Sequence, residues 1–268
     1  MIYRKIKKSD LFLIAGPCVI ESKDNLFEIA EHLKMLSEKY EFTLIFKASF
    51  LKANRTSIDS FSGPGLEKGL QMLSDVKKEF ELPILTDIHQ TNEVDAVAEV
   101  ADILQIPAFL SRQTFLLTTA AKTGKIVNIK KAQFMAPEDM EEAVNKVTSF
   151  GNNNVLVTER GTSFGYHNLV VDFRSFLKMK NLGFPVLYDV THSLQQPSIG
   201  KISGGTPQYA YKMARAAIAT GSVDGLFVET HPNPAKALSD AKSMLPLAQM
   251  EKFISGCVNL KKWMDENA

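Results

Sequence analysis

The chain has 268 residues, of which 45% are hydrophobic and 23% are charged, and its 31 basic and 30 acidic residues leave a net charge of +1. This composition is typical of a globular protein and excludes a disordered or fibrous chain. A net charge near zero argues against a protein that mainly coats nucleic acid or an acidic membrane, so we expect neither as a partner.

The cysteines and the N-terminus indicate the compartment. Two cysteines, Cys18 and Cys257, are too few for a disulfide framework, which favours a reducing environment. The basic segment 1–8 is not followed by the apolar region of a signal peptide. No apolar run approaches the roughly 18 residues of a membrane span. We therefore expect a cytoplasmic protein.

Short apolar runs rich in Val, Ile, Leu and Phe recur along the whole chain. Each is too short for a helix and too uniformly apolar for a half-exposed strand, which is typical of buried parallel strands. The predicted strands are 11–17, 42–48, 83–88, 102–107, 126–130, 154–159, 186–191 and 225–230.

The segments between these runs have apolar residues at helical spacing, with a charged outer face. Clear examples are 24–39, 65–80, 138–149 and 207–219. Alternation of strand and helix predicts an α/β protein, a (β/α)8 TIM barrel, as a single domain over 1–268 with a short N-terminal extension at 1–10. A doubly wound open sheet is the alternative.

A barrel of this kind carries its chemistry at the C-terminal ends of its strands. Reactive or polar residues stand at or just after every predicted strand end: Cys18, Lys47, Lys52, Asn54, Arg55, Asp87, His89, Gln105, Arg112, Lys130, Lys131, Glu159, Arg160, Asp189, His192, Glu229 and His231. The basic members are expected to converge on one mouth. They predict a small polyanionic substrate that carries more than one phosphate or carboxylate.

A second group combines a thiol, an imidazole and carboxylates. Cys18, His192 and Glu229 stand at strand ends, and Asp240 follows in the next loop. These ligand types suit a borderline divalent transition metal. The spacing is long-range and forms no local motif, so a buried and inert Cys18 is the alternative.

Several motifs, in order from about residue 11 to about residue 255, resemble the 3-deoxy-D-manno-octulosonate 8-phosphate synthase family. They include Ile14-Ala15-Gly16-Pro17-Cys18, Phe46-Lys47-Ala48-Ser49-Phe50, Lys52-Ala53-Asn54-Arg55, Thr86-Asp87-Ile88-His89, Gln105-Ile106-Pro107, Arg112-Gln113-Thr114, Asn128-Ile129-Lys130-Lys131, Thr158-Glu159-Arg160-Gly161, Asp189-Val190-Thr191-His192, Glu229-Thr230-His231-Pro232 and Leu238-Ser239-Asp240.

The resemblance implies an enzyme that condenses phosphoenolpyruvate with arabinose 5-phosphate. The product is an eight-carbon sugar acid phosphate for lipopolysaccharide precursor synthesis, and inorganic phosphate is released. In this family C3 of the enol attacks the aldehyde, water adds at C2, and phosphate leaves by C–O cleavage. Two mutually repelling phosphates must be held in reacting geometry, which agrees with a basic mouth.

The resemblance also implies residue roles. The residues expected to bind phosphoenolpyruvate are Lys47, Lys52, Gln105, Lys130 and Arg160. Those expected to bind the pentose phosphate are Asn54, Arg55 and Thr56, with Asp87 near the sugar hydroxyls. The family forms homotetramers, in which Arg112 is expected to reach a neighbouring subunit's site. The expected catalytic residues are Lys47, Lys52, Asp87, Lys130 and His192.

The family has metal-dependent members with Cys after Gly-Pro and metal-independent members with Asn there. Cys18 places the chain with the metal-dependent type, and His192, Glu229 and Asp240 match the other ligands. The resemblance implies a divalent cofactor that orients the aldehyde or a water. Zinc, iron and manganese all suit this ligand set.

The chain departs from the family pattern at Leu51, Asp59, Ser62 and Phe115. Three of these lie beside the pentose-phosphate motif and bear on the choice of acceptor, whereas Phe115 bears on assembly. Three other functions therefore stay open: a synthase that takes erythrose 4-phosphate, a Schiff-base aldolase with Lys130 or Lys47 as nucleophile, and a phosphosugar-binding protein without turnover.

Overall fold

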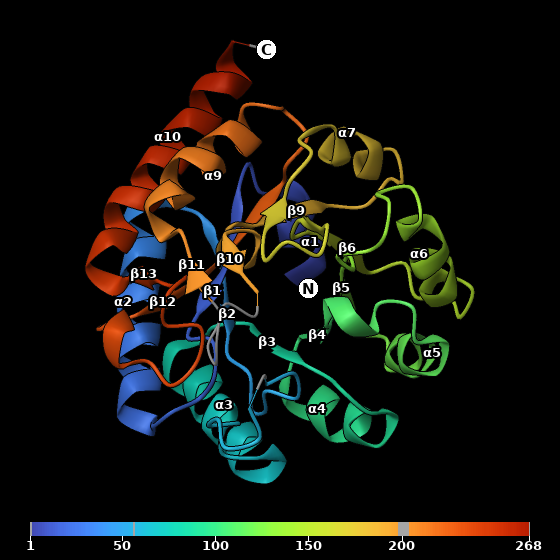
Figure 1. Cartoon of the computed structure of the whole chain (residues 1–268), viewed down its shortest axis with the longest axis vertical. Helices are drawn as coiled ribbons and strands as arrows, with labels where there is room; N and C mark the ends of the chain where they lie inside the picture. Colours follow the sequence, from blue (N-terminus) through green and yellow to red (C-terminus); the bar gives the residue numbers. More distant parts are fainter. Residues whose placement is uncertain (1, 56, 198–203, 268) are drawn as a thin grey trace.

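A computed structural model describes residues 2–55, 57–197 and 204–267. Its central sheet runs in the order β1-β2-β3-β4-β5-β6-β9-β12, and a further pairing of β1 with β12 closes it into a barrel (Figure 1). The barrel strands are β1 (Phe12–Gly16), β2 (Thr43–Lys47), β3 (Ile84–Asp87), β4 (Ile103–Ile106), β5 (Ile126–Lys130), β6 (Val155–Glu159), β9 (Val186–Asp189) and β12 (Gly225–His231). The predicted barrel is confirmed, and the open sheet is excluded because its edges would stay unpaired.

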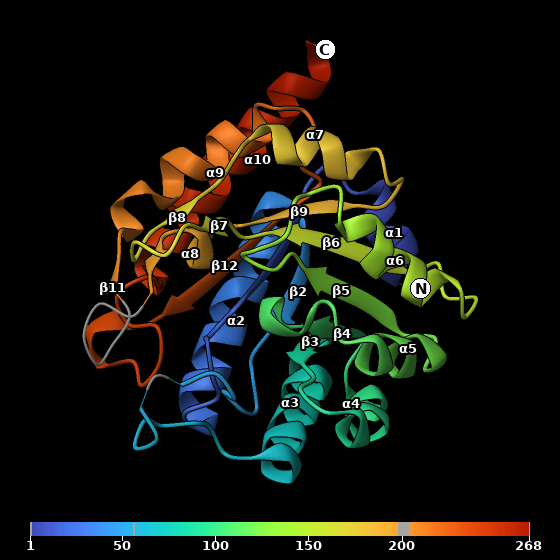
Figure 2. The same ribbon diagram turned by 45° about the vertical axis from the view of Figure 1, so that its right-hand side comes forward.

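Helices form a ring outside the barrel (Figure 1). Figure 2 shows β3 to β6 side by side with α3 to α6 on their outer face. The ring consists of α2 (Lys23–Tyr40), α3 (Leu66–Phe80), α4 (Val94–Val100), α5 (Thr114–Lys122), α6 (Met140–Thr148), α7 (Arg174–Lys180), α9 (Ala210–Ile218) and α10 (Met250–Glu266). The Ser22 side chain caps α2 by accepting a hydrogen bond from the backbone N–H of Asn25.

Short helices, hairpins and 3-10 turns lie in the segments between the barrel strands and the outer helices. Most important for the site is α8 (Val190–Ser193), directly after β9. Two small hairpins pair β7 (Thr162–Ser163) with β8 (Leu169–Val170) and β10 (Gln195–Gln196) with β11 (Gly204–Gly205), and β13 (Leu245–Pro246) adds to β12. Single 3-10 turns occupy Thr91–Glu93, Ala108–Leu110, Pro207–Tyr209, Pro234–Lys236 and Leu247–Gln249.

Two hydrophobic clusters follow from the period of two along each strand. On β1, Leu13 and Ala15 pack outward against the helices, whereas Phe12 and Ile14 belong to the cluster inside the barrel. The interior cluster takes alternate positions from the strands: Phe12, Ile14, Ile45, Leu85, Ile103, Ile126, Leu156, Leu187 and Phe227. This alternation decides which later side chains reach the site.

The N-terminal segment is a helix, α1 (Ile2–Lys8), within the expected extension. Its Ile6 is buried and joins the interior cluster, and Ile2 and Tyr3 pack against the same residues. The helix therefore lies against the end of the barrel where the strands begin, inside the ring of outer helices (Figure 1). No described helix is both long and apolar enough to cross a membrane.

Ile6→Ala is expected to lower the free energy of unfolding by about 2 kcal/mol, because it removes buried methyl groups and leaves a cavity at the barrel end. Urea unfolding of the purified protein measures the change. Lys5→Ala on the exposed face of the same helix is the control. Equal stability of the two variants would show that α1 does not support the barrel.

Candidate active site

The inward-facing positions change from apolar to polar toward the C-terminal end of each barrel strand. Lys47 follows Ile45 on the same face of β2, and Asp87 follows Leu85 on β3. Gln105 and Lys130 occupy the same kind of position on β4 and β5. Each of these polar side chains is buried. At this end, the barrel interior is thus closed by a layer of buried polar and charged side chains.

A pocket of about 220 Å³ opens above this layer. Four cationic side chains line it, those of Lys47, Lys52, Lys130 and Arg160, against one carboxylate, that of Asp87. The remaining lining is polar or apolar: Ala53, Asn54, His89, Gln105, Pro107, Ala108, Phe109, Leu110, Gln133 and His192. Local positive charge in a protein of net charge +1 indicates an anionic ligand.

Lys47 lies at the base of the pocket and is 1% exposed. Its Nζ donates to Glu229 Oε1 and to the carbonyl of Cys18, both at 3.0 Å, and lies 3.8 Å from Asp87. Burial opposes ionisation, but these neighbouring carboxylates raise the pKa of Lys47 above its ordinary value. Lys47 is therefore a fixed cation at the base of the pocket that neutralises the buried acids.

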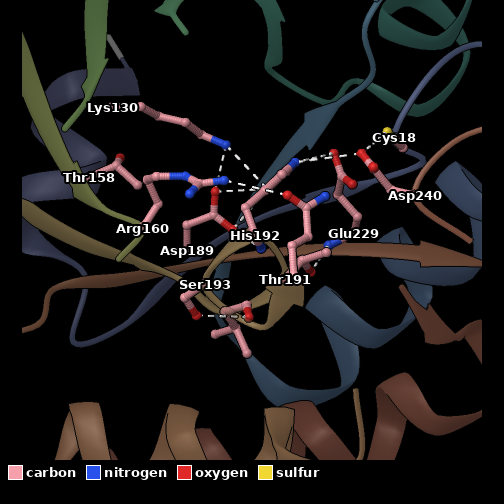
Figure 3. A network of polar contacts seen from close by, with 12 residues as sticks. Cys18, Lys130, Thr158, Arg160, Asp189, Thr191, His192, Ser193, Glu229 and Asp240 are labelled. Atoms are coloured by element: carbon pink, nitrogen blue, oxygen red, sulfur yellow. Dashed lines mark hydrogen bonds and ion pairs between the residues drawn. The ribbon is translucent and has the colours of Figure 1, made fainter. Parts of the chain in front are cut away.

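Lys130, Asp189 and His192 form a linked unit (Figure 3). The Nζ of Lys130 donates to Asp189 at 2.6 Å and lies 3.4 Å from His192 Nδ1. Asp189 caps α8 by accepting the backbone N–H of His192, and its carboxylate lies 2.8 Å from His192 Nδ1. Burial disfavours the charge, but His192 and Lys130 hold the pKa of Asp189 well below its usual range. The carboxylate thus fixes both the ring and the ammonium group.

The guanidinium group of Arg160 has a buried nitrogen without a hydrogen-bond partner in the described structure. Arg160 is buried, and Nη2 reaches Gln195 at 3.4 Å, whereas Nη1 has no such partner among the described residues. Burial lowers the pKa of Arg160, although nearby Asp189 and Glu159 oppose the shift. A bound phosphate or carboxylate would satisfy the free guanidinium nitrogen and offset its desolvation.

Asp87 begins a buried chain of hydrogen bonds across the barrel. It accepts from Ser49 and from the amide of Gln105; Asn128 donates to Gln105 at 2.9 Å, and Thr158 donates to Asn128 at 2.7 Å. Burial would raise the pKa of Asp87, but Lys47 and Lys52 hold it well below its usual range. The network fixes the direction of the Asp87 carboxylate at the pocket wall.

Cys18, Glu229 and Asp240 place one ligand atom each within 4.8 Å of one another. Gly16 of β1 pairs with Glu229 of β12, so Cys18, two residues further on, emerges beside it. A Cβ at residue 16 would lie 2.0 Å from the Lys47 carbonyl, so only glycine permits this approach of β1 to β2. The fold therefore brings these three distant residues together.

The chemistry of this group fits a metal ion. Glu229 Oε2 is buried and has no partner in the described structure. His192 stands outside the close group, but its Nε2 lies 3.6 Å from Glu229 and 3.8 Å from Asp240 (Figure 3). Its Nδ1 is held by Asp189, which is how metal-binding histidines are commonly oriented. Cys18, Glu229 and Asp240, with His192 adjacent, could thus hold a divalent cation.

Without a metal, the Cys18 thiol is protonated and donates to Asp240 Oδ2 at 2.8 Å. Burial raises the pKa of Cys18 well above its ordinary value, and the carboxylates of Asp240 and Glu229 raise it further. Coordination by the thiolate therefore requires a proton to leave.

A model of the DAHP synthetase I family matches residues 5–266. The chain belongs to this family. Proteins named 2-dehydro-3-deoxyphosphooctonate aldolase are similar over nearly their whole length. The one from Desulfatibacillum aliphaticivorans is 52% identical over 253 residues, covering 94% of this chain and 92% of its own. Those from Syntrophotalea carbinolica and Fusobacterium nucleatum subsp. nucleatum are 54% identical over 243 residues and 49% over 256, covering 90% and 95% of this chain and 87% and 92% of theirs. The resemblance read from the motifs is confirmed.

Some predicted residues of this family member lie outside the pocket. Arg55 instead donates to Ser239 Oγ at 2.6 Å and to the Leu238 carbonyl at 2.8 Å. Arg112 is exposed, and Thr56 lies outside the described residues. The expectation that Lys131 joins the other cations is wrong, because the residue after inward-facing Lys130 faces outward. The Nζ of Lys131 instead donates to the Met135 carbonyl at 3.1 Å.

Other contributors were not assigned a role from the sequence. Asp189 stands at a predicted strand end and in a motif, and Asn128 and Thr158 stand only in motifs. All three lie on the inward face, two positions after an apolar interior residue: Leu187, Ile126 and Leu156. Counting by two from those residues is the signal that identifies them. His89, expected at a strand end, and Gln133, which no sequence signal marked, line the pocket from loops.

Asp240 is expected to make stability depend on acid pH. Burial opposes ionisation, but Lys52 and His192 lower the pKa of Asp240 to about 2, below the ordinary 3.8. A lowered pKa in the folded state stabilises the fold above about pH 4, by roughly 2 kcal/mol, and this contribution is lost as pH falls toward 2.

Urea unfolding of chelator-treated protein between about pH 5 and pH 3 measures this effect. Stability is expected to fall less steeply with decreasing pH in Asp240→Asn than in the wild type. Asp95→Asn, which changes an exposed residue of α4, is the control. Parallel curves for all three proteins would contradict the prediction.

Proposed function

We infer that the chain condenses phosphoenolpyruvate with arabinose 5-phosphate to give 3-deoxy-D-manno-octulosonate 8-phosphate and inorganic phosphate, a step of lipopolysaccharide precursor synthesis. Relatives about half identical over nearly the whole chain are named for the aldolase activity on this product. The observation in the structure that carries the inference is one pocket with four cationic side chains, where two anionic substrates must meet.

The residues of the chain suit the phosphoenolpyruvate half of the reaction. Lys47, Lys130 and Arg160 present buried cations to its phosphate and carboxylate, with Lys52 and Gln105 beside them. Held in this way, C3 of the enol attacks the sugar aldehyde and forms the new C–C bond. Water adds at C2, and the C–O bond to phosphate breaks. The cations stabilise the charge that stays on the departing phosphate.

For the acceptor, Asn54 and Asp87 line the pocket, and Asp87 is oriented toward it by the Gln105 amide. Arg55 and Thr56 complete the proposed pentose-phosphate group. The hydrogen bonds of Arg55 to residues 238 and 239 connect this group to the loop that carries Asp240. Leu51, Asp59, Ser62 and Phe115, the departures from the family pattern, are all outside the pocket lining, which supports an unchanged acceptor.

We assign the metal ligands as Cys18, His192, Glu229 and Asp240, and the ion as zinc, iron or manganese. When bound, such an ion polarises and orients an aldehyde oxygen or a water. The unpartnered Glu229 Oε2 and the Asp189-oriented ring of His192 support this assignment. We assign His192 its catalytic role through this coordination, because Asp189 holds its Nδ1 and its Nε2 faces Glu229 and Asp240.

Assembly and location are part of the proposal. A homotetramer is supported by two exposed aromatic side chains: Phe109, which lines the pocket, is 59% exposed, and Phe115, in α5, is 82% exposed. Exposed Arg112 lies between them in sequence, so a neighbouring subunit is within its reach in such an assembly. Cytoplasmic location is supported by Cys18 and Cys257, which are both free thiols.

Phosphate release from phosphoenolpyruvate tests the function. The acceptors are arabinose 5-phosphate and erythrose 4-phosphate, each assayed before and after treatment with chelator. We expect release with the pentose alone, loss on chelation and recovery with a divalent metal. Phosphate release only with erythrose 4-phosphate would show that this sugar, and not the pentose, is the acceptor. Saturable binding of sugar phosphate without phosphate release would indicate a protein without turnover.

A further inference from the structure

Glu21 connects two segments that flank the proposed metal site. It lies three residues after Cys18, between β1 and α2. Its Oε1 accepts the backbone N–H of Leu238 at 2.8 Å, and its Oε2 lies 3.4 Å from His231 Nε2. The side chains of Glu21 and His231 are only 13% and 7% exposed, so water competes weakly for these contacts.

His231 is held in one orientation by its own loop. It ends β12, two residues after Glu229, and its Nδ1 accepts the backbone N–H of Asn233 at 2.9 Å. Its Nε2 lies 2.7 Å from the Asn25 side-chain amide and 3.4 Å from the Glu21 carboxylate. Contacts at both ring nitrogens therefore hold the His231 ring against the Glu21 carboxylate.

These contacts act on the loop that carries Asp240. Leu238 precedes Asp240 by two residues, and Asp240 has a φ of 47°, a left-handed conformation that a non-glycine residue adopts only when its surroundings enforce it. The Glu21–Leu238 hydrogen bond joins the segment of Cys18 to the segment of Asp240. It thereby limits how far Cys18 Sγ and Asp240 Oδ2, now 2.8 Å apart, can separate.

We propose that Glu21 and His231 are positioning residues that set the separation of Cys18 and Asp240 for metal binding. The proposal rests on the metal site of the proposed function. Neither residue lines the pocket, and neither belongs to the close ligand group. Their effect on the metal passes through the backbone of the loop, as outer residues commonly act on metal ligands.

The test compares Glu21→Gln with wild type in metal affinity. Glutamine keeps the shape and one acceptor for the Leu238 N–H, but it removes the negative charge that strengthens this hydrogen bond and replaces the oxygen that faces His231 Nε2 with an amide nitrogen. Chelator-treated protein is titrated with Co²⁺, and the thiolate-to-cobalt charge-transfer absorption reports binding at Cys18. We expect Co²⁺ affinity to fall about tenfold to a hundredfold.

Glu28→Gln is the matched control, because it removes an exposed carboxylate from the same helix region and should titrate as wild type. At saturating Co²⁺, Glu21→Gln should recover the kcat of wild type, which a damaged pocket would not allow. Wild-type Co²⁺ affinity in Glu21→Gln would overturn the positioning role.

Two further outcomes are distinguishable. Absence of the thiolate band in the wild type would overturn the metal site itself, and with it that part of the proposed function. Thermal unfolding of the metal-free proteins checks that Glu21→Gln folds. If it does not fold, Glu21→Asp takes its place, since it keeps the charge but shortens the reach to Leu238; unchanged affinity there would equally overturn the proposal.

Discussion

Replacing Lys130 with methionine is expected to lower kcat/KM for phosphoenolpyruvate about a thousandfold, or roughly 4 kcal/mol. The substitution removes a buried cation from the pocket wall, and Asp189, with His192 still beside it, then faces an anionic substrate without the Lys130 ammonium group. Steady-state kinetics of phosphate release measures the loss, with thermal unfolding to confirm that the variant is folded.

Lys130→Arg separates two roles for the ammonium group. If Lys130 acts by its charge, arginine should recover part of the activity, and borohydride with substrate should not trap the wild-type enzyme. If Lys130 is a Schiff-base nucleophile, arginine should be as inactive as methionine, and trapping should occur. The second pattern would reject the proposed mechanism in favour of an aldolase that forms an imine.

Lys131→Met is the matched control, because Lys131 is the next residue and is also buried but faces away from the pocket. It should lower stability, since Glu159 loses a partner 3.5 Å away, and leave the KM for phosphoenolpyruvate unchanged. A large KM effect of Lys131→Met would contradict the assignment of inward and outward faces on β5.

Cys18→Asn is expected to abolish sensitivity to chelators, whereas chelation should lower wild-type activity roughly a hundredfold. An asparagine amide can donate to Asp240 in place of the thiol, which preserves the local contact, but it provides no thiolate for a metal. In the family that the motifs resemble, the members with Asn at the position of Cys18 are the metal-independent type. Phosphate release with and without chelator measures the change.

Cys257→Ala is the control for this prediction. Cys257 is equally buried but lies in α10 among apolar side chains, away from the pocket. Its removal should cost stability and leave chelator sensitivity as in the wild type. If Cys18→Asn is inhibited by chelator as strongly as the wild type, Cys18 is not a ligand.

The barrel could be predicted from the sequence because its signals are local. Each strand is a short apolar run, and each helix has a charged face, so alternation alone specifies the eight pairs. The closing pair, β1 with β12, joins residues more than two hundred positions apart and follows only from the number of units. The packing of α1 against the barrel end carried no such signal, because Ile6 is one apolar residue in a basic segment.

For the candidate site, the sequence supplied residue types but not the directions of the side chains. Residue types at strand ends indicated an anionic substrate, and the motifs of a known family supplied individual roles. The direction of each side chain depends on the period of two within a strand. This period places Lys130 inside the barrel and Lys131 outside it, and it also places Asp189 inside. That period is present in the sequence, but its starting face is fixed only where an apolar residue is known to lie inside the barrel.

Contacts between loops required the tertiary structure. Arg55 donates to the Leu238 carbonyl and to the Ser239 hydroxyl, and Glu21 accepts the Leu238 N–H, so two of these three bonds join segments about two hundred residues apart through a backbone group. A backbone N–H or carbonyl is the same at every position, so no residue type marks it as a partner. The sequence by itself determined the barrel and the charge of its mouth. Only the folded chain decided which groups meet there, because hydrogen bonds depend on distances that chain closure sets.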